Sequence, residues 1–266
     1  MKRTSRSALH AVAVLFAVGS VTSASGAAAD DGAGPFGVTT VAAATVRTAR
    51  VGALFSGGRR FCTASVVHSP QRDLVVTAAH CLDRTRDADI VFVPGYRDGK
   101  APYGAWRLGR RFLPEGWVKG RGAGREDSDV AFAVVVSERG GKGDGRVEDA
   151  VGGNRFVAGM ATGATAVTVT GYPNSRQAPI GCTDKPTPHS RLQQRIECPG
   201  FSGGTSGSPW VNGDGAVVGV LGGHDGGGAT AGVSFSVVFG EEAAKLYQEA
   251  ERGSGGIAGE QGSPVN

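Results

Sequence analysis

The chain has 266 residues, 40% of them hydrophobic and 20% charged, and this composition excludes an intrinsically disordered protein. Its 45 glycines, with many Val and Thr residues, favour short strands and tight turns over long helices. The net charge of +4 overstates the basic character, because the first 29 residues supply three Lys or Arg residues and no acid. The remaining chain carries a net charge of only +1, so the pI of about 9.0 gives no reason to expect a nucleic acid partner.

The N-terminus has the three parts of a secretory signal peptide. Three basic residues lie within the first six positions, an apolar run covers residues 8–18, and small residues lead to Ala29. The apolar run is shorter than the ~20 residues that a membrane-spanning helix needs. We therefore expect a signal peptide over residues 1–29, a secreted protein, and no stable membrane insertion after cleavage.

Four cysteines are an even number in an exported chain, which predicts two disulfides. Of the three pairings we favour the most local one, Cys62 with Cys81 and Cys182 with Cys198, in which each bond closes a loop of roughly 15 to 20 residues. A zinc site is the alternative, but no Cys-x-x-Cys pair occurs and the histidines are scattered. We therefore expect no metal and no cofactor.

Residues 30–47 are rich in Ala, Gly and Thr without an amphipathic period, and we interpret them as a pro-segment or a loose arm. From Val51 onward, short apolar runs bounded by turns predict strands. The last of these, 129–136, is apolar enough to be buried. Together they predict an N-terminal β-domain over residues 48–140. The runs cover residues 51–55, 61–67, 73–77, 90–93, 106–108, 117–118 and 129–136.

Residues 137–154 are rich in glycine and charge and are typical of a linker between two halves. The second half, 141–251, repeats the pattern of short strands, which is typical of sandwiches or barrels. Residues 241–250 contain strong helix formers and predict one C-terminal helix. A flexible tail is expected over residues 252–266. The expected strands of this half cover residues 166–173, 192–198, 216–221 and 232–235.

The stretch Gly204-Thr205-Ser206-Gly207-Ser208-Pro209 places two serines among glycines. By itself it is typical of a turn, because Gly, Ser and Pro are the usual turn residues. A serine hydroxyl becomes an effective nucleophile only when a base and an orienting group activate it. The chain offers candidates for both partners.

His80 is the candidate base, in Thr77-Ala78-Ala79-His80-Cys81, where we expect one helical turn. A histidine side chain can take up and return a proton near neutral pH. Asp129 is the candidate orienting carboxylate, because it stands where a polar run meets a buried strand. Asp127, two residues earlier, is the reserve choice.

The order His80, Asp129, Ser206 on an exported, disulfide-bearing β chain resembles the chymotrypsin-fold (trypsin-like) serine proteases. The resemblance runs from about Val51 to Ala250, and its histidine block is specific. Cys62-Thr63-Ala64-Ser65 also matches, with Cys62 as the partner of Cys81. Within the family, Ser206-Gly207-Ser208-Pro209 and Gly171-Tyr172-Pro173 are most similar to the bacterial branch that includes the glutamyl (V8-like) endopeptidases.

The resemblance implies an all-β fold of two six-stranded antiparallel β-barrels with a C-terminal helix, and a site in the cleft between the barrels. It implies that Ser206 attacks the substrate, His80 shuttles the proton and Asp129 orients the histidine. The backbone N–H groups of Gly204 and Ser206 would form the oxyanion hole. Glycine suits that place because no side chain blocks the donor.

The sequence departs from the family pattern in three places. Thr205 stands where the animal enzymes have an aspartate that pairs with a new N-terminal amine, so we expect that activation switch to be absent. Residues 198–203 carry no carboxylate for binding Lys or Arg. Leu221 stands where the glutamate-specific relatives have a histidine, which leaves His224 as the candidate for meeting an acidic side chain.

The sequence therefore predicts a secreted, monomeric serine endopeptidase that cleaves a protein or peptide substrate through an acyl-enzyme. Ser208 is the rival nucleophile, but it lacks the preceding Gly-x of the pattern. The alternative function is a catalytically dormant binding or adhesion protein with a protease fold. A nucleic acid binder is a third reading, which the small charge of the exported chain disfavours.

Overall fold

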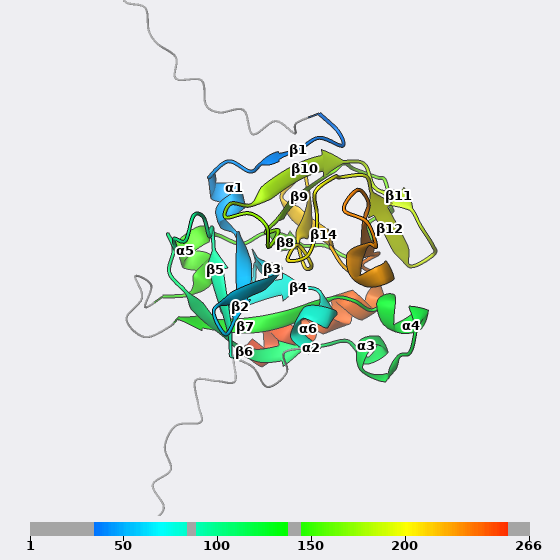
Figure 1. Cartoon of the computed structure of the whole chain (residues 1–266). Coiled ribbons are helices and arrows are strands. Elements are labelled where there is room, and N and C mark those ends of the chain that lie inside the picture. Colours follow the sequence, from blue (N-terminus) through cyan, green and yellow to red (C-terminus); the bar gives the residue numbers. More distant parts are fainter. Residues whose placement is uncertain (1–34, 84–88, 138–144, 255–266) are drawn as a thin grey trace, which may run out of the picture. The chain divides into compact units, whose positions relative to one another are not determined.

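The computed structural model of the chain describes residues 35–83, 89–137 and 145–254. The expected signal peptide (1–29) and most of the expected tail (252–266) lie outside these residues. In the described part, strands dominate, and the helices are short apart from α6 (Glu241–Ser254) at the C-terminal end (Figure 1).

The strands of the first half close into a barrel in the order β2-β3-β4-β7-β6-β5, and all neighbouring strands are antiparallel. These strands coincide with the apolar runs that the sequence predicts. Closure leaves this sheet without an unpaired edge. In chain order the strands are β2 (Val51–Ser56), β3 (Arg59–Val67), β4 (Leu74–Thr77), β5 (Ile90–Pro94), β6 (Trp106–Phe112) and β7 (Ala131–Ser137).

β7 shows why a wholly apolar strand suits this fold. Successive side chains of a strand point to opposite faces. Ala133 and Val135 belong to the core inside the barrel, while Phe132 and Val134 pack in a second core with Leu246 of α6. Both faces of β7 are therefore buried, and each fully buried valine or phenylalanine contributes roughly 1.5–3 kcal/mol.

One predicted element of the first half is wrong. Trp117 and Val118 continue the strand pattern in the sequence, but they lie in the short helix α3 (Glu115–Lys119). The helix follows Pro114, and its burial is one-sided: Trp117 joins the barrel core and Val118 stays exposed. A two-residue apolar run is too short for its periodicity to distinguish a strand from a helix.

The second half consists of a six-stranded sheet, β1-β10-β9-β13-β14-β8, and a three-stranded sheet, β11-β12-β15. Side chains from both sheets form one core, in which Trp210 is fully buried beside Ile196. With the closed barrel and α6, this arrangement agrees with the predicted all-β fold. The strands are β8 (Arg155–Phe156), β9 (Val167–Gly171), β10 (Ile180–Asp184), β11 (Thr187–Pro188), β12 (Gln193–Ile196), β13 (Pro209–Asn212), β14 (Ala216–Val220) and β15 (Ser234–Val237).

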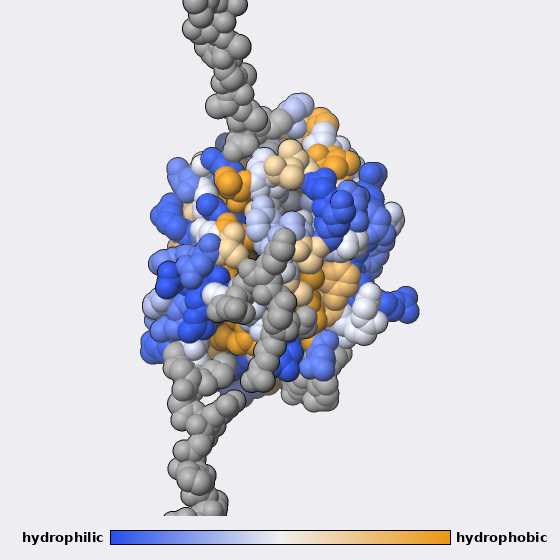
Figure 2. All heavy atoms as spheres, turned by 90° about the vertical axis from the view of Figure 1, so that its left-hand side faces the viewer, coloured by the Kyte–Doolittle hydropathy of each residue, from blue (hydrophilic) through white to orange (hydrophobic). Residues whose placement is uncertain are grey.

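The described end of segment 30–47 pairs with the second half. β1 (Thr39–Val41) is antiparallel to β10, and α1 (Val46–Ala49) follows with a capping box between Thr45 and Thr48. Exposed large apolar side chains are concentrated in this stretch, which holds four of the seven in the described chain: Phe36, Val38, Val41 and Val46. Figure 2 looks at the side that is on the left in Figure 1, where α1, α5 and β5 lie, and shows apolar residues among hydrophilic ones.

Two further helices refine the predicted boundaries. α5 (Val147–Val151) forms within the expected linker, because Val147 and Val151 pack on the barrel core. The C-terminal helix is confirmed but extends to Ser254, beyond the expected start of the tail at residue 252, where Ser254 Oγ donates to Gln71 Oε1 at 2.7 Å. None of the helices in the described part combines the length and the apolar character needed to cross a membrane.

Candidate active site

The barrel brings His80 and Asp129 together, although 49 residues separate them. β4 and β7 are antiparallel neighbours, and Thr77 at the end of β4 pairs with Ala131 at the start of β7. His80 follows in α2 (Ala79–Asp83), and Asp129 lies two residues before the start of β7. Both side chains therefore emerge at the same end of the barrel.

The Asp129 carboxylate is 1% exposed and accepts three hydrogen bonds. Oδ1 accepts from the His80 backbone N–H at 2.9 Å, and Oδ2 accepts from His80 Nδ1 at 2.7 Å and from the Gly223 N–H at 2.8 Å. These donors compensate for the loss of water around a buried carboxylate. Because Nδ1 donates to Asp129, Nε2 is the imidazole nitrogen left for proton transfer.

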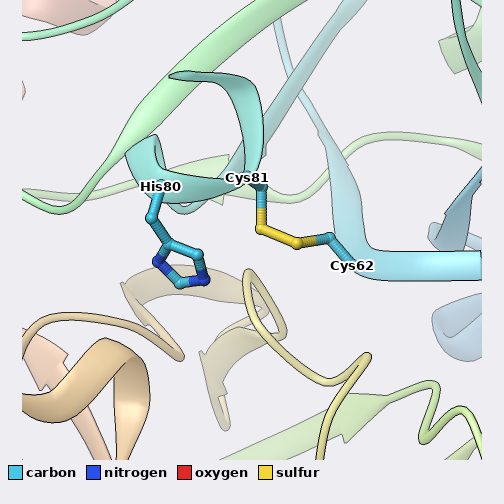
Figure 3. A group of neighbouring side chains, drawn as sticks. All are labelled: Cys62, His80 and Cys81. Atoms are coloured by element: carbon cyan, nitrogen blue, oxygen red, sulfur yellow. A yellow bond between two sulfur atoms is a disulfide. The ribbon is translucent and has the colours of Figure 1, made fainter. Parts of the chain in front are cut away.

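Figure 3 shows the disulfide that anchors the histidine. Cys62 on β3 is bonded to Cys81, the neighbour of His80 in α2, with 6.2 Å between the two Cα atoms. The bond ties the histidine's backbone to the barrel. It also takes up both sulfurs, so this group of side chains offers no thiolate to a metal. The second disulfide, Cys182–Cys198, completes the local pairing that the sequence favours.

Thr63 of β3 holds the serine loop from the barrel side. Its N–H donates to the Ser206 carbonyl at 2.7 Å, and its Oγ1 donates to the Gly204 carbonyl at 3.0 Å. The same Oγ1 accepts from the Tyr172 N–H at 3.0 Å. The Tyr172 hydroxyl donates to the Val51 carbonyl, and burial raises the pKa of this phenol, so it remains a donor. The loop is thus fixed by buried hydrogen bonds.

Gly207 brings the loop against the strand that leads to the histidine. Its φ is +82°, and a Cβ there would lie 2.1 Å from Thr77 Oγ1 and 3.1 Å from the Ala78 nitrogen. Only glycine allows this approach without displacement. Since Ala78 precedes His80 by two residues, half-buried Ser206 is held beside the turn that carries the histidine.

The peptide bond between Gly203 and Gly204 has the orientation that an oxyanion site needs. The Gly203 carbonyl accepts from the Asn174 N–H at 2.8 Å. In a trans peptide the N–H points opposite to the carbonyl, so the Gly204 N–H points away from Asn174. Within the described residues, neither the Gly204 N–H nor the Ser206 N–H donates to another protein group. Both remain available to a negatively charged oxygen.

A side chain at Gly204 is expected to disrupt this orientation. Gly204 has φ +100°, and a Cβ there would lie 2.5 Å from Asn174 Oδ1 and 2.6 Å from the Tyr172 carbonyl. We expect Gly204→Ala to lower kcat on a peptide substrate by roughly 10²–10³-fold, the effect of losing one oxyanion donor. Gly203→Ala is the matched control, because its Cβ would meet only Asn174 Nδ2 at 3.9 Å. Equal kcat values for the two variants would contradict this role of Gly204.

The rival candidates are engaged elsewhere. Ser208 is fully buried, and its Oγ donates to the Thr205 carbonyl at 2.7 Å. Thr205 is buried and donates its own Oγ1 to the Ser202 carbonyl. Asp127, the reserve carboxylate, accepts from Gln193 Nε2 at 3.0 Å, whereas the histidine binds Asp129. The geometry therefore favours Ser206 over Ser208 and Asp129 over Asp127.

His224 begins η1 (His224–Gly227) and lies beside two carboxylates. Its Nδ1 is 3.6 Å from Glu126 Oε2, at the end of α4 (Ala123–Glu126), and its Nε2 is 3.4 Å from Asp225 Oδ2. Leu221 is buried in the core of the second half. Both ring nitrogens of His224 thus face acids of the chain itself, which argues against its use for an acidic substrate side chain. The ring also contacts His189 and Phe235.

The sequence does not reveal the contacts that three contributors make in the site. Gly223 supplies a backbone donor to Asp129, Thr63 holds the serine loop, and Gln193 contacts Asp127. The two glycines at 222 and 223 hint at a close backbone approach, but nothing in the sequence indicates its target. The other two contacts join residues that are far apart in the chain.

The chain matches the family model of the trypsin-like peptidase domain over residues 62–220, which is more than half of its length. Among solved structures, protease Anisep from Arthrobacter nicotinovorans is 26% identical, with a TM-score of 0.68, covering 81% of this chain and 100% of that one. A thermostable serine protease, AL20, from an extremophilic microorganism is also 26% identical, with a TM-score of 0.66, covering 78% and 99%.

A Glu endopeptidase is similar at 18% identity, with a TM-score of 0.64, covering 83% of this chain and 99% of that one, and at this identity it shows the fold alone. No curated protein sequence matches the chain. The family match includes the blocks around His80, Asp129 and Ser206. The chain therefore belongs to the trypsin-like peptidase family and has the chymotrypsin fold of a serine endopeptidase.

Proposed function

We propose that this protein is a secreted serine endopeptidase in which Ser206 is the nucleophile, His80 the general base and acid, and Asp129 the group that orients the histidine. The observation that carries the proposal is the buried contact between His80 Nδ1 and Asp129 Oδ2, at 2.7 Å. This contact lies at the end of the barrel on which the Ser206 loop docks.

The reaction has two steps. Ser206 Oγ attacks the carbonyl carbon of the scissile peptide bond, while His80 Nε2 takes up the hydroxyl proton. The N–H groups of Gly204 and Ser206 stabilise the negative oxygen of the tetrahedral intermediate. His80 then gives the proton to the leaving amine, the C–N bond breaks, and an ester to Ser206 remains. Water, deprotonated by His80, hydrolyses this ester and regenerates the serine.

The orientation of the Gly203–Gly204 peptide supports activity rather than dormancy. A dormant protease-fold protein can retain its triad while an oxyanion donor is turned away. Here the Gly203 carbonyl is held by the Asn174 N–H, which leaves the Gly204 N–H free. The Gly204 N–H can therefore donate to a negatively charged oxygen without a rotation of this peptide.

The proposed substrate is a protein or peptide that meets the enzyme outside the cell. Two disulfides, Cys62–Cys81 and Cys182–Cys198, favour an oxidising compartment, in agreement with the signal peptide expected over residues 1–29. No carboxylate occurs in residues 198–203, which disfavours cleavage after Lys or Arg. The carboxylates beside His224 likewise disfavour glutamate as its ligand.

A fluorophosphonate probe tests the nucleophile directly. The folded wild-type protein should form a covalent adduct whose mass and site map to Ser206, and Ser206→Ala should form none. Ser208→Ala is the matched control and should still be labelled, because the Ser208 hydroxyl is buried and hydrogen-bonded to the Thr205 carbonyl. An undiminished adduct in Ser206→Ala, or no adduct on the wild type, would refute the proposed mechanism.

A further inference from the structure

The segment that ends in Asp129 is joined to the second half of the chain at four consecutive positions. Each contact reaches a different group, so the segment acts as a clamp between the two halves. The four pairs are Glu126 with the His224 ring, Asp127 with Gln193, Ser128 with Glu242, and Asp129 with the Gly223 N–H.

Gln193, the partner of Asp127 in this clamp, uses both polar atoms of its side-chain amide in hydrogen bonds. Its side chain, at the start of β12, is 3% exposed. Oε1 accepts from the His224 backbone N–H at 3.0 Å, and Nε2 donates to Asp127 Oδ1 at 3.0 Å. Only one amide orientation fits, because the flipped one would set a carbonyl against a carboxylate and an NH₂ against an N–H.

The backbone between these two bonds carries the donor for Asp129. Gly223 has φ +81°, and a Cβ there would lie 2.4 Å from Gln193 Oε1. On the other side, a Cβ at Gly222 would lie 2.7 Å from Asp129 Oδ2. The two glycines thus run between Gln193 and Asp129, and the position of the Gly223 N–H depends on both.

We propose that Gln193 is a positioning residue for the catalytic triad, which rests on the proposed function. By holding the His224 N–H with one atom and Asp127 with the other, it aims the Gly223 N–H at Asp129 Oδ2. That oxygen is the one that also binds His80 Nδ1. A displaced Gly223 would free the carboxylate to rotate, and the imidazole would lose its fixed orientation.

The test replaces the Gln193 amide by a carboxyl group, first alone and then together with the replacement of the Asp127 carboxylate by an amide. In Gln193→Glu, the introduced carboxyl group faces Asp127 in a buried site. It fits there only in its protonated form, because the protonated acid can still donate a hydrogen bond to Asp127. In the double variant Gln193→Glu, Asp127→Asn, the new amide at 127 donates to the carboxylate at 193. The other oxygen of that carboxylate then accepts from the His224 N–H as the amide oxygen did.

We expect kcat of Gln193→Glu, relative to wild type, to fall at least roughly tenfold between about pH 6 and pH 9, since the burial and the Asp127 charge both raise the pKa of the introduced acid. The sign follows from its protonation: the fitting form exists below this pKa and is lost above it. In the double variant the relative kcat should stay constant over this range. The titratable groups around the pair are Asp127, Asp129 and His80 from the barrel side, Glu126 from α4, and His224 and Asp225 from η1.

Activity is measured per active site titrated with the fluorophosphonate, so a loss of folded protein does not enter. Gln194→Leu is the matched control: it neighbours Gln193 on β12, is also buried, and its side chain makes no hydrogen bond to the described part of the chain. It should match the wild-type profile. A constant relative kcat in Gln193→Glu, or a double variant no better than the single one, overturns the inference. If the wild type is neither labelled nor active, the proposed function itself fails.

Discussion

Replacement of His80 by alanine is expected to lower kcat on a peptide substrate by roughly 10⁵–10⁶-fold. The imidazole is hydrogen-bonded to the buried Asp129 carboxylate, and it belongs to the turn that follows Thr77 and Ala78, against which the serine loop packs. Without it, no group takes the proton of Ser206 during attack. A residual rate of roughly 10³–10⁴-fold over water should persist, because the oxyanion donors are untouched.

The measurement is single-turnover and steady-state kinetics with a peptide that the wild type cleaves. His68→Ala is a matched histidine control, since His68 is exposed and its ring contacts Glu148 rather than the triad. It should retain wild-type kcat. A His80→Ala variant within tenfold of wild type would show that another group acts as the base.

Removal of the Cys62–Cys81 disulfide is expected to affect both stability and turnover. The bond spans 19 residues, and its loss in Cys62→Ala, Cys81→Ala should cost about 3 kcal/mol in the chain-entropy model. For a domain of this size that corresponds to a fall in Tm of roughly 6–12 °C. Because Cys81 neighbours His80 in α2, kcat per titrated site should also fall, by roughly tenfold or more, as the histidine loses its anchor.

The Cys182–Cys198 bond supplies the control for this second prediction. It spans 16 residues, so Cys182→Ala, Cys198→Ala should lose a similar free energy of unfolding. It lies in the core of the second half, and kcat per titrated site should stay close to wild type. Thermal unfolding by circular dichroism, with active-site titration before each kinetic run, separates the two effects. Equal kcat values for both disulfide variants would show that the first bond does not position His80.

The order of His80, Asp129 and Ser206 predicted the family and the groups to examine, because each residue stands in a short stretch with a local chemical pattern. The pairing of the cysteines followed from locality in the chain. Most strands of the barrel were equally readable, since a short apolar run bounded by turn residues is a local signal. The helix at Trp117 could not be recognised from the sequence, because two adjacent apolar residues fit the period of a strand as well as that of a helix.

The choice between neighbouring candidates needed the tertiary structure. Ser206 and Ser208 have similar sequence surroundings, but Ser208 is buried against the Thr205 carbonyl. Asp127 and Asp129 are two residues apart, and the register of β4 against β7 sets only Asp129 against His80.

The sequence by itself determined the chemistry that is present, namely a serine among glycines, a histidine beside a cysteine and an acid at a strand start, because these patterns lie within a few residues of one another. Only the tertiary structure decided how these groups are held. The Gly223 N–H on Asp129, the Thr63 contacts to the serine loop and the two bonds of Gln193 each join residues that are far apart in the chain. Such contacts depend on strand register and on the close approach of glycine backbone, and neither is encoded in a local stretch of residues.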